Sequence, residues 1–578
     1  MKLLFTYLKP YKKFVFLAPL LMIIEVGSEI LMPKLMTKII DIGIANNNFA
    51  YIGKIAIIMI LLAILGVVGG IGCLIAASIA SQKMGRDIRK EIFIKVQAFS
   101  FSNIDKFKPS SLITRLTNDI TQIQMVALMS LRLLVRAPLL SVGSIFMAAS
   151  INLKLTLVFL VMIPVVVGVM ALIIKKGFPL FQLVQEKLDT VNTVMRENLS
   201  GVRVVKAFVR GDFEKEKFKT VNEDYKDTTI KAFRVVVFMM PSMMLILNLA
   251  TIAILWFGGL QVQQGTIQIG DIMAFITYLT QILMSLMMIA MVFMTISRAE
   301  VSSERISEVL SCEIDIKDPE NPVEKEIEKG TVTFKNVSFR YEGGSGDPVL
   351  EDISFEAKSG ETIAILGETG SGKSTLVNLM PRLYDTNEGE VLIDGVNVKD
   401  YHLKDLRHKV AVVLQEAILF SGTIRDNIKW GKEDATEEEV ITAAKAAQAH
   451  DFIMKLPQQY DTELGQKGVN VSGGQKQRIS IARALIKNPA VIIFDDSTSA
   501  VDMVTEKKIQ KALRESKNQC TQFIIAQRIS SVSHADKILV LSAGKIVAEG
   551  NHETLMETSK DYQEIYYSQM RKGETMHE

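Results

Sequence analysis

The sequence has few cysteines, and their scarcity excludes two kinds of protein. Cys73, Cys312 and Cys520 are the only three, and they lie far apart without forming a CxxC pair. A disulfide framework and a cysteine-based zinc site are therefore both disfavoured. We predict that the three thiols stay reduced and are structural.

A surplus of charge of one sign is also lacking. The chain carries 66 basic and 63 acidic side chains, which leaves a net charge of +3. A protein held to DNA or RNA mainly through phosphate contacts needs a basic surface. We therefore predict no nucleic-acid partner.

The composition does not fit one kind of domain. The chain has 578 residues, which is room for about three or four domains of ordinary size. Hydrophobic residues make up 48% and charged residues 22%. This is too apolar for an ordinary soluble enzyme and too charged for a chain lying wholly in lipid. Two unlike halves are indicated.

Long apolar runs are concentrated in the first half of the chain. Each is about 20 residues or more, which is enough for a helix to cross a hydrocarbon core of roughly 30 Å. The runs occupy residues 14–36, 55–80, 126–151, 155–174, 235–260 and 272–296, and they predict six transmembrane helices. The first run contains Glu25 and Glu29 and no small-residue cleavage site follows it, so we interpret it as a retained helix and not a signal peptide.

The distribution of basic residues predicts the orientation of these helices. Lysines before the first run place the N-terminus in the cytoplasm: Lys2, Lys9, Lys12 and Lys13. Residues 3–14 suit a helix in the membrane interface. The long charged stretches 81–125 and 175–234 are expected to be helices that continue into the cytoplasm. We predict a multi-pass protein of the inner (plasma) membrane, with the C-terminal domain also cytoplasmic.

The second half has the pattern of a soluble α/β domain. Residues 313–330 are acidic and contain Pro319 and Pro322, a composition typical of a linker between domains at residues 1–312 and 331–578. Short β-branched runs that alternate with helical segments predict a parallel sheet. The expected strands are residues 362–366, 410–414, 491–494, 523–526 and 537–541. The predicted fold class is an all-α six-helix transmembrane domain followed by a soluble α/β domain.

A P-loop follows the first of these strands and precedes a helical segment. Its residues are Gly367, Glu368, Thr369, Gly370, Ser371, Gly372, Lys373, Ser374 and Thr375. The glycines let backbone N–H groups turn toward phosphate oxygens, Lys373 reaches the terminal phosphates, and the Ser374 hydroxyl can bind Mg²⁺. ATP and Mg²⁺ are the predicted cofactors, so the α/β domain is predicted to be a P-loop nucleotide-binding domain. Asp495 and Asp496 end a later strand, where one carboxylate would hold the metal and the next would face the attacking water.

A further motif carries a resemblance to a known family. Val471, Ser472, Gly473, Gly474 and Gln475 resemble the signature of ATP-binding cassette (ABC) proteins. The other family motifs lie before and after the signature in the order typical of the family. Tyr341 is in the place of the aromatic that stacks on adenine, and Gln415 is in the place of the Q-loop glutamine, which also binds the metal. Residues 462–468 resemble the X-loop, and residues 499–502, with Asp502, resemble the D-loop.

The resemblance covers the whole chain, which looks like one half of an ABC exporter. Residues 102–107 and 201–208 resemble the two coupling helices that dock on the cassettes. In this family a nucleotide is held between the P-loop of one cassette and the signature of another. The resemblance therefore implies a dimer.

Two positions depart from the family's pattern of catalytic residues. Asp496 stands where a Glu is usual, and Gln527 stands where a His is usual. Asp is shorter than Glu, and Gln cannot become a cation near the γ-phosphate. With these two changes and the intact signature, the chain resembles one particular subunit of bacterial heterodimeric multidrug exporters. That subunit is the one whose own ATP site is degenerate, that is, lacks the usual catalytic residues. The alternative is a homodimer with two slow, equal sites.

The sequence gives less information about the transported substrate. Met284, Met287, Met291 and Met294 recur at helical spacing and would suit a cavity for varied apolar ligands, but they suit ordinary helix packing equally well. Glu25 and Glu29 have Arg132 and Arg136 as evident counter-charges, and a structural ion-pair cluster is favoured over a site for a cationic drug. Asp41 is a candidate for an extracellular gate.

The function predicted is ATP-driven export of drug-like or amphipathic small molecules. A flippase for lipids or lipid-linked glycans would use the same machine and is the first alternative. A non-transporting ABC regulator is the second. Substrate identity and the partner subunit do not follow from the sequence.

Overall fold

The computed structural model describes residues 2–341, 346–497, 501–514, 520–526, 529 and 532–574. The chain forms two compact units. Unit 1 comprises Met1–Val96 and Ser110–Ser311, and unit 2 comprises Gln97–Pro109 and Cys312–Glu578. A short segment from the first half of the sequence therefore belongs to unit 2.

Among the described residues, unit 1 contains six helical segments that are long and apolar enough to cross a membrane. They are Leu3–Ile44, Phe49–Gln97, Pro109–Ile151, Leu153–Ser200, Gly211–Gln263 and Ile269–Ile289. The predicted fold class is confirmed. Most of the helices are much longer than the apolar runs within them, because charged residues with good helix propensity continue the same helix beyond the apolar stretch.

The N-terminal segment is not the single helix expected over residues 3–14. Helix α1 (Lys2–Leu8) is followed by a 3₁₀ turn, η1 (Lys9–Tyr11), and then by α2 (Lys12–Lys38). Pro10 in η1 lacks the N–H that a continuous α-helix needs, which explains the break. The Tyr7 and Tyr11 hydroxyls donate to Glu91 and Asp87 of α3 (Phe49–Gln97), which holds the segment against that helix.

Two π-helical turns direct charged side chains toward α11 (Ile269–Ser311). A π turn inserts an extra residue and so rotates the side chains around it. In η3 (Arg115–Asp119), Arg115 donates to Glu308 of α11 at 2.7 Å, and Asp119 accepts from Ser302 at 2.8 Å. In η2 (Ile39–Ile44), Asp41 accepts from the Gly270 N–H at 2.8 Å. Helix α11 is thus held near both of its ends.

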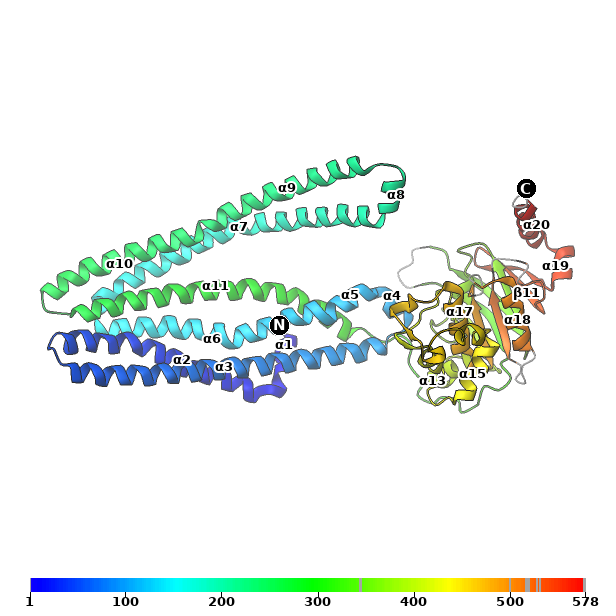
Figure 1. The fold of residues 1–578 in the computed structure, drawn as a ribbon, viewed down its shortest axis with the longest axis horizontal. Coiled ribbons are helices and arrows are strands. Elements are labelled where there is room, and N and C mark those ends of the chain that lie inside the picture. Colours follow the sequence, from blue (N-terminus) through cyan, green and yellow to red (C-terminus); the bar gives the residue numbers. More distant parts are fainter. Residues whose placement is uncertain are drawn as a thin grey trace. The chain divides into compact units, whose positions relative to one another are not determined.

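The α7–α9 hairpin of unit 1 diverges from the other helices of that unit (Figure 1). It consists of α7 (Leu153–Ser200), α8 (Val202–Ala207) and α9 (Gly211–Val237), and α10 (Met239–Gln263) continues it. Helices α7, α10 and α11 share one apolar core. Helix α8, at the tip, has no buried residue; Val204 within it is 60% exposed, and Phe208 and Val209 just after it are 74% and 88% exposed.

Unit 2 contains two larger sheets. The six-stranded sheet has the order β12-β11-β3-β10-β9-β6 and is parallel except for β12. Its strands are β3 (Thr362–Gly367), β6 (Val410–Val413), β9 (Val491–Asp495), β10 (Thr521–Ile525), β11 (Lys537–Ser542) and β12 (Lys545–Gly550). Every residue of β9 and β10 is buried, which is the pattern of a parallel sheet covered on both faces. All five strands expected from the sequence are present.

The second sheet is antiparallel and was not predicted. Its order is β2-β1-β4-β5, with β1 (Val332–Phe339), β2 (Leu350–Ala357), β4 (Glu388–Ile393) and β5 (Val396–Asn397). Register shifts interrupt β1 near Asn336, which has a φ of 47°. Such bulges break the alternation by which a strand is recognised in sequence.

The contact between Asp41 and α11 gives a prediction about stability. A Cβ at position 270 would lie 2.5 Å from Asp41 Oδ2. Gly270→Ala should displace the carboxylate and lower the free energy of unfolding by about 1–3 kcal/mol, the cost of a lost buried hydrogen bond. Thermal unfolding in detergent measures this. Gly259→Ala in α10 is the matched control, because a Cβ there would meet nothing within 4 Å. Equal unfolding midpoints for the two variants would contradict the prediction.

Candidate functional site

The P-loop follows the backbone path that its glycines allow. It connects β3 to α12 (Lys373–Asn378). Gly370 and Gly372 have φ values of 88° and 98°, a region that costs other residues energy. A Cβ at position 372 would also lie 2.9 Å from the Val349 carbonyl oxygen. The spacing of glycines in the motif is therefore required by the conformation.

Lys373 lies at the centre of the loop. Its Nζ donates to the carbonyl oxygens of Gly367 at 2.9 Å and Glu368 at 2.6 Å. Burial lowers the pKa of this ammonium group, whereas Asp496 and Asp495 nearby oppose the change. The amine is thus partly desolvated and positioned by backbone acceptors, which suits it to contact an anionic group.

Four oxygen-bearing side chains from distant segments meet beside Lys373. The Ser374 hydroxyl donates to Asp495 Oδ1 at 2.8 Å. The Gln415 side-chain amide, after β6, donates to Asp496 Oδ2 at 3.2 Å. Burial raises the pKa of Asp495, and Asp496 adds to the rise. Asp496 has a φ of 45°, so the chain turns sharply just after β9.

These groups line a cavity of about 340 Å³. Its other walls include Thr369, Gly370, Gly372 and Thr375 of the P-loop. Hydroxyl, amide and carboxylate oxygens are the ligands that Mg²⁺ prefers. The donor set of Ser374, Gln415 and Asp495 therefore fits this metal. Among the described residues there is no cluster of three or more His, Cys, Asp or Glu that would favour another one.

Tyr341 lies next to the P-loop. Its hydroxyl is 2.9 Å from the Thr375 hydroxyl, and its ring packs edge-on against Phe339 and Tyr384. Ser371 is buried, with its hydroxyl 3.5 Å from Lys373 Nζ. The structure thus gathers Tyr341 and the predicted P-loop, metal and Q-loop residues in one place.

The signature segment lies elsewhere on the surface of unit 2. It begins α17 (Gly473–Leu485), where Ser472 is the N-cap: the Gln475 N–H donates to the Ser472 hydroxyl at 3.4 Å, and the Ser472 N–H donates to Gln475 Oε1 at 2.9 Å. Ser472 and Gly473 are exposed. Residues Val471, Ser472, Gly473, Gly474 and Gln475 do not line the P-loop cavity.

One further predicted residue, Asp502, is not among the described residues that line the cavity. Asp502 accepts from the Thr505 N–H at 2.9 Å and from its hydroxyl at 2.7 Å, at the start of α18 (Met503–Arg514). Those bonds lower the pKa of Asp502. Gln527 and residues 499–500 of the predicted D-loop lie outside the described residues.

The segment grouped with unit 2 from the first half contains the first predicted coupling helix. This is α4 (Phe101–Phe107), which Ser100 and Asn103 cap reciprocally. Asp105 accepts from the Tyr384 hydroxyl at 2.8 Å, and the Phe101 ring stacks on the Tyr384 ring. Burial, followed by the bond to Asp105, raises the pKa of Tyr384. Since Tyr384 also contacts Tyr341, aromatic rings connect α4 to the P-loop cavity.

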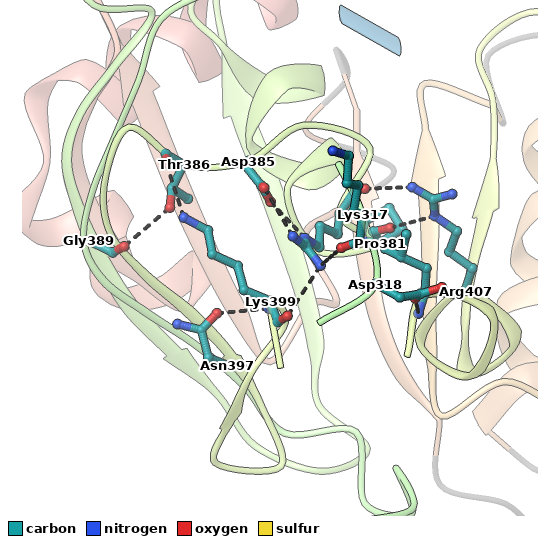
Figure 2. A network of polar contacts seen from close by, with 11 residues as sticks. Lys317, Asp318, Pro381, Asp385, Thr386, Gly389, Asn397, Lys399 and Arg407 are labelled. Carbon is teal, nitrogen blue, oxygen red and sulfur yellow. Dashed lines mark hydrogen bonds and ion pairs between the residues drawn. The ribbon is translucent and has the colours of Figure 1, made fainter. Parts of the chain in front are cut away.

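A polar network beside Tyr384 ties the linker to the same turn (Figure 2). Arg382 is buried, has a φ of 51°, and forms two bonds to Asp385 at 2.8 and 3.2 Å. Its remaining nitrogen donates to the Lys317 and Lys399 carbonyl oxygens, both at 3.2 Å. Arg407 donates to the Arg382 and Pro381 carbonyl oxygens at 2.7 and 3.2 Å.

Residues 381–385 were not singled out from the sequence. They follow the P-loop helix directly, and both α4 and the linker contact them. The one signal in the sequence is an arginine directly after a proline at the end of a short helix, which is too common to indicate a function. Their role depends on partners that are distant in the sequence.

Comparison with known proteins identifies the family. Residues 15–286 match the family described as ABC transporter transmembrane region, and residues 350–499 match the family described as ABC transporter. The chain is 44% identical over 569 residues to the ABC transporter ATP-binding protein YfiB of Bacillus subtilis, with 98% of each chain covered. The chain is a member of the ABC transporter family.

Two further comparisons indicate the kind of transporter. The chain is 33% identical over 583 residues to Bacillus subtilis YgaD, whose name describes a multidrug export ATP-binding/permease protein, with 98% of each chain covered. A structure of a bacterial Atm1-family ABC exporter with ATP bound has a TM-score of 0.79 and 27% identity, covering 96% of this chain and 98% of that one. The chain is thus an exporter half-transporter, a multi-pass membrane protein that binds and hydrolyses ATP.

The bond between Tyr384 and Asp105 gives a prediction about the attachment of α4. Tyr384→Phe removes the hydroxyl and keeps the ring contacts. A hydrogen bond to a charged group is worth about 1.5–3 kcal/mol, so amide hydrogen exchange over residues 101–107 should accelerate about tenfold or more.

Tyr401→Phe is the control for this experiment. The Tyr401 hydroxyl is also buried in unit 2, where it donates to the Ile393 carbonyl oxygen at 2.9 Å. That variant should leave exchange over residues 101–107 unchanged. If Tyr384→Phe also leaves it unchanged, the hydroxyl does not hold α4.

Proposed function

We propose that the chain is one subunit of a heterodimeric exporter that uses ATP to move drug-like or amphipathic small molecules across the plasma membrane by alternating access. The observation that carries the dimer in this proposal is the separation of the P-loop cavity from residues 471–475 within one chain, and the departures at Asp496 and Gln527 support unlike subunits. A nucleotide at the P-loop needs hydrogen-bond donors on its outer face. The signature of a second subunit would supply them.

The P-loop, the three metal-binding residues and Tyr341 each have a role in this proposal. ATP lies along residues 367–375, with Lys373 at its terminal phosphates and Tyr341 against its adenine. Ser374, Gln415 and Asp495 hold Mg²⁺, which neutralises phosphate charge when bound. The Ser374–Asp495 bond at 2.8 Å supports this assignment, because it already positions two of the ligands.

We further propose that the ATP site on this chain binds nucleotide but turns it over slowly. The Asp496 carboxylate is drawn back from the place of a Glu by about 1.5 Å, the length of one C–C bond. Its contact with Gln415 at 3.2 Å holds it there. A well-placed general base is worth about 10²–10⁴-fold in rate. Gln527 would also lack the charge of a His near the γ-phosphate.

The second coupling helix supports a dimer independently. The tip around α8 exposes Val204, Phe208 and Val209. Each cassette has a groove of about 460 Å³ whose walls include Leu414, Ile418, Phe420 and Trp430, with Phe420 stacked on Trp430. We propose that the α8 tip of one subunit docks in this groove on the cassette of the other. Burial of these apolar side chains would favour the dimer.

The methionines of α11 remain a proposal for the substrate cavity. Met284 is 49% exposed and Met287 is partly exposed, so both could face a ligand in the assembled exporter. The side chains of Met291 and Met294 lie outside the described part of the chain. Unbranched thioethers would adapt to varied apolar molecules.

We place the protein in the plasma membrane, which is the inner membrane in a cell that has two. The cassette then lies in the cytoplasm, where ATP is available. The lysines before the first span support this orientation.

The asymmetry of the two ATP sites is tested by two substitutions in the assembled complex. Asp496→Gln should lower turnover only modestly, because little base catalysis remains at that site. Ser472→Arg should lower turnover about 10²–10³-fold, because the signature contacts the γ-phosphate in the partner's competent site. ATP turnover of the purified complex in nanodiscs measures both effects, with expression and ATP affinity checked for each variant.

A comparable loss in both variants would show that Asp496 is a catalytic base, and the homodimer would then be favoured. Asp496→Glu with Gln527→His gives a complementary measurement. If the shape of these two side chains limits ATP turnover at this site, turnover should rise in the double variant. No rise would place the defect in the partner's signature.

A further inference from the structure

Unit 1 contains a cavity of about 530 Å³ within its membrane-spanning helices. It lies between α2, α3 and α6 (Ile120–Ile151). One wall is apolar and comes mainly from α3: Leu62, Val67, Ile71 and Leu74. The other wall carries Glu25 and Glu29 of α2 and Arg132 of α6. Charged side chains are costly in a bilayer, so such a wall indicates a binding function.

The ion pairs of this wall are unevenly distributed. Arg136 bonds to Glu25 and, at 2.7 Å, to Glu29, so one guanidinium serves both carboxylates. Arg132 Nε is shielded from solvent and has no hydrogen-bond partner, and neither does Glu25 Oε2. No ion pair of Arg132 occurs within the part of the chain that the structure describes. The expectation that both arginines pair with the two glutamates therefore fails for Arg132.

After Arg136 is paired, one negative charge and one positive charge of this wall are left without a partner among the described residues. Two carboxylates and one guanidinium leave an excess of one negative charge at Glu25 and Glu29, while Arg132 keeps one positive charge. A cation alone would leave Arg132 without an anion. An anion alone would leave the carboxylates in excess. A molecule with both an ammonium group and an anionic group would satisfy the two together.

Small residues of α3 shape the polar end of the cavity. A Cβ at position 70 would lie 3.0 Å from the Glu25 carboxylate, and one at position 66 would lie 3.2 Å from Ser28 Cβ. Gly66 and Gly70 therefore leave room beside the charged wall that a larger side chain would fill. The apolar residues beyond them would contact a hydrocarbon chain.

We propose that this cavity binds a zwitterionic amphiphile, with its anionic group on Arg132, its ammonium group at Glu25 and Glu29, and its apolar chain along α3. This specifies the class of amphipathic substrate in the proposed function and rests on it. A lipid of the bilayer and a transported amphiphile carry the same chemistry. The test must therefore separate binding from transport.

The assembled exporter is placed in nanodiscs of phosphatidylglycerol, which has no ammonium group, and binding is measured without ATP. Three fluorescent probes carry a hydrocarbon chain of the same length: lysophosphatidylethanolamine is zwitterionic, lysophosphatidic acid is anionic and an alkylamine is cationic. The unmodified exporter should bind the zwitterion about tenfold more tightly than either other probe.

Two variants should shift this selectivity in opposite directions. Arg132→Gln removes the positive charge and should make the cationic probe the tightest. Glu29→Gln leaves Arg136 paired with Glu25 and should make the anionic probe the tightest. Arg196→Gln, at an exposed arginine of α7, is the control and should change nothing. A purely structural role would weaken all three probes equally in both variants and would overturn the proposal, as would equal affinity of the unmodified exporter for the probes.

A second measurement separates this proposal from the proposed function. ATP is added, and movement of the bound zwitterion between leaflets is followed in vesicles. Transport would identify the ligand as a substrate. Selective binding without transport would keep the site and identify its ligand as a lipid of the bilayer, which would count against export of this class of molecule.

Discussion

The negative charge of a bound triphosphate is the constraint on which the rest of the structure depends. A P-loop surrounds only one side of such a ligand, and the other side needs oriented donors as well. In this chain the donors of residues 471–475 begin α17, outside the P-loop cavity. In the proposed function, one chain therefore supplies two half sites and not one whole site. The exposed apolar tip at α8 is a second incomplete surface of the same chain. A dimer would complete both.

The turn after the P-loop helix contacts both the linker and α4. Arg382 fixes this turn to the linker through the Lys317 carbonyl oxygen, and Tyr384 fixes it to α4 through Asp105. The linker and α4 both lie where the chain passes between unit 1 and unit 2. Their contacts on this turn, Arg382 and Tyr384, are two residues apart, and Tyr384 also packs against Tyr341. A shift of the P-loop helix would therefore act on both connections.

The features that could be predicted from the sequence are those that depend on residues close together in the chain. Apolar length predicts the six spans, and the spacing from Gly367 to Thr375 predicts the P-loop, because each depends on neighbouring residues alone. The antiparallel sheet was missed because residues such as Asn336 interrupt its alternation. Tyr384 and Arg382 were missed because their partners are distant. The sequence makes Arg132 and Arg136 equally good candidates to pair with Glu25 and Glu29. Only the three-dimensional structure shows that Arg136 forms ion pairs with both carboxylates.

The most direct test of the account is to determine which nucleotide each subunit holds during turnover. The assembled exporter is given a photoreactive ATP labelled at either the γ- or the α-phosphate, and the label on each subunit is measured after crosslinking. The account predicts that this chain keeps both labels, because its site holds intact ATP. The partner should keep the α label and lose the γ label. Equal loss of the γ label from both subunits would contradict the account.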